Sequence, residues 1–136
     1  MNAYDKAIQL LKIRAHHSGE LERKLLMRKF SRGEVDETIK RLVQERLLDN
    51  SQFAENFLHN LIKYKNFGFY MFKAKLMQRG LAGNEAEVLL REHLSLELEQ
   101  SIAEKIKDRE TDRMKLAQKL QRKGFRTEVI QKLIDK

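Results

Sequence analysis

Pairs of basic residues recur at one fixed spacing in three parts of the chain, and their chemistry is that of anion binding. The two members of a pair lie four positions apart, which places them on one face of a helix. The pairs are Lys24 and Arg28, Lys75 and Arg79, and Lys119 and Lys123. Six cations in register predict a stripe that binds phosphates or an acidic protein groove. Solvated residues beside a core position give the same pattern, so both interpretations stay open.

The most aromatic part of the chain lies among further lysines, at positions 63, 65, 73 and 75. It consists of Phe67, Phe69, Tyr70, Met71 and Phe72, and the lysines are Lys63, Lys65, Lys73 and Lys75. Aromatic rings among cations can stack the bases of a single strand. Packing inside the protein is the alternative, and we favour it: Phe72 in the core, and Phe67, Phe69 and Tyr70 between repeats.

Residue types for catalysis or metal binding are scarce. The chain has no cysteine, which excludes disulfides, thiol catalysis and zinc–thiolate sites. Its histidines, at positions 16, 17, 59 and 93, lack the spacing and partners of a zinc site. Neither a phosphate-binding glycine loop nor a nucleophile elbow is present. We therefore expect no enzymatic activity, no metal and no cofactor.

Composition indicates a helical protein with a polyanionic partner. The 136 residues include no proline, and the apolar residues are mostly leucine, isoleucine, methionine, alanine and phenylalanine, which suit helices. A net charge of +8 favours binding to nucleic acid or an acidic protein surface. The first ten residues contain Asp5 and Lys6 and do not form the apolar part of a signal peptide. No apolar run approaches the length of a membrane span, so we expect a cytoplasmic protein.

An internal repeat must position the basic pairs. With Leu25, Leu76 and Leu120 as anchors, apolar residues recur at matched distances before and after each anchor. These positions are Ala3, Ala54 and Leu98; Ala7, Leu58 and Ile102; Leu11, Ile62 and Ile106; Leu21, Phe72 and Leu116; Phe30, Leu81 and Phe125; Val35, Ala86 and Ile130; and Ile39, Leu90 and Ile134. The spacing predicts three helices in every copy, with Gly80 and Gly124 just after the second helix.

The predicted fold is all-α, with three tandem three-helix repeats over residues 1–48, 49–94 and 95–136. We expect one continuous structural unit, an elongated array whose curvature depends on the joints between repeats. Predicted helix N-caps are Ser31, Asn84, Asp112 and Thr127.

Several segments resemble the bacterial RecX family of recombinase regulators. Residues 46–54, RLLDNSQFA, are similar to the family's entry into its second repeat. Residues 65–69, KNFGF, and 76–81, LMQRGL, resemble its basic glycine-containing turn and the helix end that follows. Residues 14–16, RAH, and 20–25, ELERKL, resemble its first-repeat signature. The family often has proline where Phe69 stands, glycine where Asn66 and Lys29 stand, and a capping serine where His17 stands.

The resemblance implies a function through protein contact. RecX-like proteins bind the RecA recombinase filament on single-stranded DNA and restrain its ATPase and strand-exchange activities. The implied partner is thus the RecA filament, with contact to single-stranded DNA, and we expect a monomer that inhibits. Replacing Lys75 and Arg79 by glutamate is then expected to weaken filament binding without unfolding the protein.

Two other functions fit parts of the sequence. A second helix, a glycine turn and a third helix have the proportions of a helix-turn-helix DNA-binding regulator. Carboxylates at the start of the third helices, Glu34, Asp36, Glu85 and Glu87, disfavour it because phosphates repel them. A general helical adaptor for an acidic protein is the remaining alternative.

Overall fold

The computed structural model describes residues 1–135, and in this range all regular structure is α-helical. Nine helices follow one another within the described residues. They are α1 (Ala3–Ile13), α2 (Ser18–Met27), α3 (Arg32–Gln44), α4 (Asn50–Tyr64), α5 (Phe69–Gln78), α6 (Gly83–His93), α7 (Leu96–Lys107), α8 (Arg113–Arg122) and α9 (Thr127–Ile134). The prediction of an all-α fold is confirmed.

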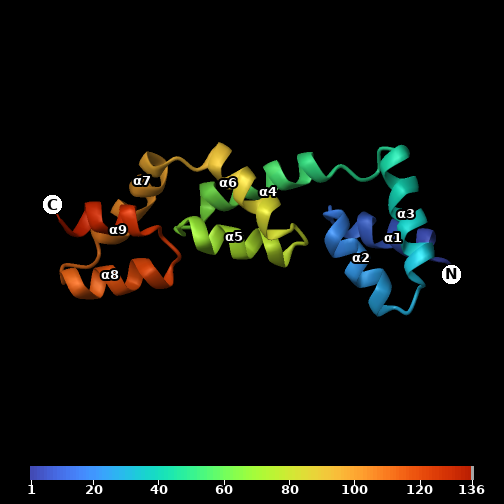
Figure 1. The fold of residues 1–136 in the computed structure, drawn as a ribbon, viewed down its shortest axis with the longest axis horizontal. Coiled ribbons are helices and arrows are strands. Elements are labelled where there is room, and N and C mark those ends of the chain that lie inside the picture. Colours follow the sequence, from blue (N-terminus) through green and yellow to red (C-terminus); the bar gives the residue numbers. More distant parts are fainter. Residues whose placement is uncertain (136) are drawn as a thin grey trace.

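The helices form an elongated array of three triplets, with the two termini at opposite ends (Figure 1). We call α1–α3, α4–α6 and α7–α9 the first, second and third repeats. The contact region between the first two repeats is the first joint, and that between the last two is the second joint. The exact division at residues 48/49 and 94/95 stays a prediction.

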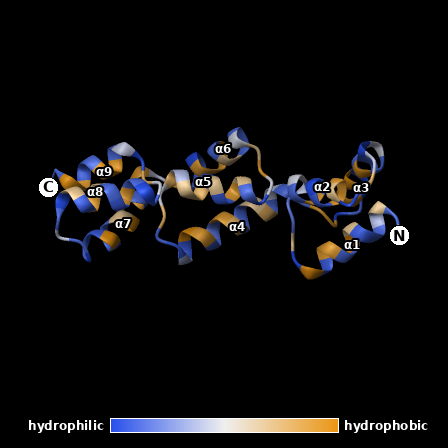
Figure 2. Ribbon diagram, turned by 90° about the horizontal axis from the view of Figure 1, so that it is seen from below, coloured by the Kyte–Doolittle hydropathy of each residue, from blue (hydrophilic) through white to orange (hydrophobic). Residues whose placement is uncertain are grey.

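The anchor leucines occupy the centre of each repeat. Leu25, Leu76 and Leu120 are fully buried. The residues four positions earlier, which are Leu21, Phe72 and Leu116, are buried too. Apolar and polar residues alternate along each helix at helical spacing (Figure 2), so every helix turns one apolar side inward.

The apolar core is divided unequally among the repeats. One buried cluster contains residues of the first repeat and the segment after it, from Ala7 to Leu48. A second cluster runs without interruption from Ala54 to Leu133 and joins the second and third repeats. The first joint therefore depends on polar contacts more than the second does.

The predicted apolar pattern holds only in part in the third repeat, where Ile130 and Ile134 pack at the edge of the core. Leu98 lies near the start of α7 and is 38% exposed, because it stands on the solvent side of that first turn. In α9 the fully buried residues are Val129 and Leu133, while Ile130 and Ile134 are only half-buried. The apolar stripe of α9 is thus centred one residue earlier than the repeat predicts.

Two of the four predicted helix N-caps are confirmed. Ser31 and Asp112 are the N-caps of α3 and α8, as predicted, and their side chains accept backbone N–H groups of the first turn. The predictions for Asn84 and Thr127 are wrong, because α6 and α9 begin one or two residues earlier, after Ala82 and Arg126.

In the second and third repeats, a glycine with left-handed backbone conformation follows the middle helix and lies against the preceding repeat. Gly80 and Gly124 have φ values of 108° and 85°, the conformation that suits a helix C-terminus. A Cβ on either residue would meet backbone atoms of the preceding repeat at under 3.0 Å. The equivalent position of the first repeat is Lys29, which has φ 68° and is exposed. Because Lys29 is exposed, a side chain is sterically possible there.

Candidate functional site

The predicted basic pairs lie on the middle helix of each repeat. The helices α2, α5 and α8 succeed one another along one side of the array (Figure 1). The second member of each pair ends its helix, because Arg28, Arg79 and Lys123 are the C-cap residues. Cations at this end are favoured by the partial negative charge of the helix C-terminus.

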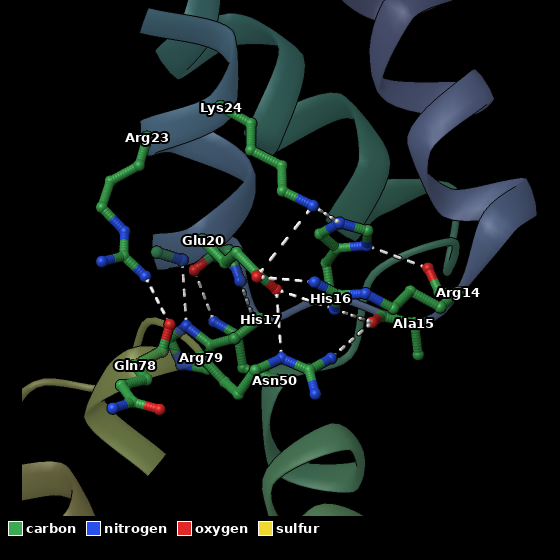
Figure 3. A network of polar contacts seen from close by, with 12 residues as sticks. Arg14, Ala15, His16, His17, Glu20, Arg23, Lys24, Asn50, Gln78 and Arg79 are labelled. Atoms are coloured by element: carbon green, nitrogen blue, oxygen red, sulfur yellow. Dashed lines mark hydrogen bonds and ion pairs between the residues drawn. The ribbon is translucent and has the colours of Figure 1, made fainter. Parts of the chain in front are cut away.

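At the first joint, cations from two repeats surround one buried carboxylate (Figure 3). Arg14 donates two hydrogen bonds to Glu20, at 3.0 and 2.8 Å. Arg79 of α5 donates to Glu20 across the joint at 3.3 Å, and the Lys24 ammonium lies 4.0 Å from it. Arg79 also donates to the carbonyl of Ala15 at 3.3 Å. Of the predicted cations, Arg79 therefore crosses the joint, and Lys24 adds positive charge beside the same carboxylate from within the first repeat.

The charges around Glu20 decide its ionisation. Burial is the largest single influence and raises its pKa, but the hydrogen bond and charge of Arg14 and the charges of Arg79 and Lys24 act in the opposite direction. Together they lower the pKa of Glu20 to about 2. The carboxylate is therefore ionised throughout the neutral range and contributes stability that protonation would remove.

Replacement of Glu20 by glutamine should reduce the free energy of unfolding by about 2–3 kcal/mol near pH 7. The pKa is depressed in the folded state, so this contribution is complete above about pH 4.5, the unfolded value, and is lost as the pH falls toward about 2. Urea unfolding followed by circular dichroism at several pH values measures the difference between wild type and Glu20→Gln.

The matched control is Glu37→Gln, which changes an exposed carboxylate on α3. The free energy of unfolding of this variant should differ little from that of wild type at every pH measured. If the Glu20→Gln difference also stays constant from pH 7 to pH 2.5, then the ion cluster does not stabilise the joint as the geometry indicates.

The two histidines before α2 have structural roles at the same joint. His16 donates through Nδ1 to the Arg14 carbonyl at 2.9 Å, and its Nε2 accepts from Lys24 at 2.8 Å. Burial lowers the pKa of His16, and the positive charges of Lys24 and Arg14 add to that effect. The ring is therefore neutral at pH 7. His17 is the N-cap of α2, because its Nδ1 accepts the Gly19 N–H at 2.9 Å.

Further polar contacts cross the first joint. His17 lies 3.3 Å from a carboxylate oxygen of Glu85 on α6. Asn50, the first residue of α4, accepts the Ser18 N–H at 2.8 Å and donates to the Ser18 hydroxyl at 2.7 Å. The first turn of α2 is thus capped by a side chain of the following repeat (Figure 3).

The second joint contains a buried ion pair that the sequence did not predict. Glu99 of α7 is fully buried, and Arg126, the N-cap of α9, lies with Nε 2.5 Å from its carboxylate. The same carboxylate accepts the backbone N–H groups of Arg126 and Phe69, at 2.9 and 3.0 Å. The N-cap of α5 is Gly68, which has no side chain, so Glu99 of the third repeat caps α5 instead.

Two predicted cations lie near one aromatic ring at the second joint, and neither forms an ion pair among residues 1–135. The Lys75 and Lys123 ammonium groups lie 6.0 and 5.8 Å from the centre of the Phe67 ring. Both lysines and the ring are half-buried. The structure thus brings together the first member of one basic pair and the second member of the next, at both joints.

Other predicted binding residues lie apart from this cluster. Lys73 is two positions from Lys75 on α5 and points to another side of the helix, where it pairs with Glu87 at 2.9 Å. Lys63 and Lys65 end α4 and are exposed, and Lys119 is half-buried on α8. Arg28 is exposed and donates to the Lys24 carbonyl at 3.2 Å.

The aromatic segment is only partly internal. Phe69 and Phe72 are buried, and Phe69 lies under the Arg126 guanidinium at 4.7 Å. Phe67 is half-buried and contacts Phe72 edge-on. Tyr70 is 56% exposed, yet it lines a hollow with Gly124 and Phe125 of the third repeat, so its predicted packing between repeats holds only in part.

Residues 1–135 hold no group of three or more histidine, aspartate or glutamate side chains placed to bind a metal. In the same range, every helix is too short or too polar to cross a membrane.

Comparison with known proteins places the repeats in a family. Residues 3–42 match the family model described as RecX, first three-helix domain. The chain is 33% identical to the regulatory protein RecX of Prosthecochloris aestuarii over 140 aligned residues, covering 98% of this chain and 91% of that protein. It is 36% identical to the regulatory protein RecX of Chlorobium phaeobacteroides, a match that spans 67% of this chain and 60% of that protein.

Solved structures show the same fold. The crystal structure of RecX from Lactobacillus salivarius superposes with a TM-score of 0.83 at 24% identity, covering 98% of this chain and 92% of that one. That similarity concerns the helical architecture alone. The similarity to the Prosthecochloris protein extends over nearly the whole of both chains. This chain therefore belongs to the RecX family.

Proposed function

We propose that this protein is a regulator without enzymatic activity that binds the RecA recombinase filament on single-stranded DNA and inhibits its ATPase and strand exchange. Membership of a family whose members are named regulatory proteins supports a regulatory role. The proposal includes a cytoplasmic monomer that needs no cofactor. Contact with both recombinase and DNA is part of it.

The observation that carries the proposal is the repetition of basic pairs along the array. They lie on α2, α5 and α8, which follow one another on one side of an elongated molecule (Figure 1). Lys24 and Arg79 are paired with Glu20, and the other four cations leave positive charge along the array, which suits a partner that is itself a repeating polyanion. A nucleoprotein filament has this property, whereas a compact acidic protein offers a shorter surface.

A helix-turn-helix regulator is less well supported. The third helices would have to present their first residues to a major groove. In α6 those residues are carboxylates with partners inside the protein, because Glu85 lies beside His17 and Glu87 pairs with Lys73. The start of this helix is therefore used for packing between helices.

Purified protein added to RecA on single-stranded DNA should lower the rate of DNA-dependent ATP hydrolysis. The effect should depend on the concentration of the protein and weaken as salt is raised, since part of the binding is ionic. Unchanged hydrolysis at protein concentrations equal to or above that of RecA would count against the proposal.

A further inference from the structure

Corresponding positions at the two joints differ in charge. At the first joint Lys24 and Arg79 converge on the carboxylate of Glu20. In the repeat register Lys75 and Lys123 occupy the same positions at the second joint, and Met71 replaces Glu20. The second joint therefore retains both cations and lacks the carboxylate.

The two lysines at the second joint have no acidic partner within 4.0 Å in the part of the chain that the structure describes. The Glu99 carboxylate at this joint is fully buried and already accepts three hydrogen bonds from Arg126 and Phe69. The positive charge of the lysines is thus available to an external anion.

Both ammonium groups lie near the same aromatic ring, that of Phe67. Each ammonium lies about 6 Å from the ring centre, at distances of 6.0 and 5.8 Å. The ring is fixed by its edge-on contact with Phe72, and the adjacent Gly68 N–H donates to the Lys123 carbonyl at 3.0 Å. An anion bound beside this ring would be attracted by both positive charges.

The residue types favour a phosphate over a carboxylate. Arginine matches a carboxylate with its planar fork, and Arg14 is used in that way on Glu20 at the first joint. Lysine is a compact charge that binds phosphate as a point cation. Exposed Lys63 and Lys65, just before Phe67 in the chain, extend the positive charge, and the aromatic ring suits contact with a base.

We propose that Lys75, Lys123 and Phe67 form a binding site for the phosphodiester backbone of single-stranded DNA. The inference deepens the proposed function and rests on it for the identity of the strand, which is the DNA inside the filament. In this proposal the cations of the second joint bind DNA, whereas the equivalent cations of the first joint bind the Glu20 carboxylate and stabilise the array.

The test is the affinity of the full chain for a fluorescently labelled 20-nucleotide oligo(dT), measured by anisotropy at several salt concentrations. Lys75→Gln/Lys123→Gln should bind about tenfold more weakly than wild type, because the variant cannot make two charge-assisted hydrogen bonds to phosphate. The slope of log affinity against log salt should fall by about 1.4, or roughly 0.7 for each phosphate that is no longer neutralised.

The control is Lys12→Gln/Lys40→Gln, which removes the same charge from exposed positions of the first repeat. It should bind like wild type within about twofold, since charges beyond a Debye length are largely screened. Circular dichroism of both variants should match wild type, because neither pair of lysines forms an ion pair within the described residues.

Three results would overturn the inference: no oligo(dT) binding by wild type at 20 mM salt, undiminished binding by Lys75→Gln/Lys123→Gln, or an equal loss in the control. Loss of binding to DNA-free RecA with unchanged oligo(dT) affinity would also overturn it, since the lysines would then serve an acidic protein. Oligo(dT) binding needs no recombinase, so this inference and the proposed function can fail separately.

Discussion

Replacement of Arg126 by alanine should lower the free energy of unfolding by about 3–5 kcal/mol. The Glu99 carboxylate is 0% exposed and lies 2.5 Å from the Arg126 Nε. Without the guanidinium, a buried negative charge keeps only backbone N–H partners. The same side chain donates to the Leu94 carbonyl at 3.1 Å and covers the Phe69 ring, so the substitution removes those interactions as well.

Urea unfolding at pH 7, followed by the helical circular dichroism signal, measures this loss. Arg122→Ala is the matched control, because Arg122 is an exposed arginine four residues earlier, in the last turn of α8. It should change stability by no more than about 0.5 kcal/mol. A loss below about 1 kcal/mol for Arg126→Ala would mean that the ion pair does not hold the second joint.

Replacement of Gly124 by alanine should lower stability by about 2–5 kcal/mol. The residue has φ 85°, a conformation that costs an L-residue with a Cβ about 1–2 kcal/mol. The new methyl group would also meet the backbone nitrogen of Met71 in the preceding repeat at under 3.0 Å. Crowding of this kind costs about 1–3 kcal/mol further, because backbone cannot move aside as a flexible side chain can.

Gly33→Ala separates this steric effect from the ordinary consequences of replacing a glycine. Gly33 lies in the first turn of α3, and a Cβ there meets nothing within 4 Å. Alanine at that position should leave stability unchanged or raise it by up to about 1 kcal/mol. Equal behaviour of the two variants in thermal unfolding would contradict the close approach of the second and third repeats at Gly124.

The helices and their repetition could be predicted from the sequence because they depend on local spacing. Leucines 25, 76 and 120 are the buried centres of three similar triplets, and the pattern around them repeats at helical intervals. Glycine after the second helix could also be predicted. The sequence did not reveal that Gly80 and Gly124 also touch the preceding repeat. A signal for it exists: the equivalent left-handed position of the first repeat is Lys29, so the conformation alone does not require glycine.

The contacts at the joints could not be predicted because they join residues far apart in the chain. Glu99 and Arg126 are 27 residues apart, and Glu20 and Arg79 are 59 apart. In the sequence all four resemble ordinary surface charges. Arg79 in particular was expected to be replaceable without unfolding, yet it crosses the first joint, so Arg79→Glu would place two carboxylates together.

The departures from the family pattern have local physical explanations. Lys29 adopts the left-handed conformation that glycine would accept more readily. Phe69 is the first residue of α5, a position that suits proline, but its N–H donates to Glu99, which proline cannot do. His17 replaces a capping serine and caps α2 through Nδ1. The fold therefore tolerates each exchange.

Binding to the RecA filament is the central claim, and a direct comparison of two ligands tests it best. Labelled oligo(dT) alone and the same oligonucleotide coated with RecA and a slowly hydrolysed ATP analogue are each titrated with the protein at 150 mM salt. The account predicts at least tenfold tighter association with the coated strand, and modest, salt-sensitive affinity for the naked one. Equal affinity for both, or binding to the naked strand alone, would contradict it.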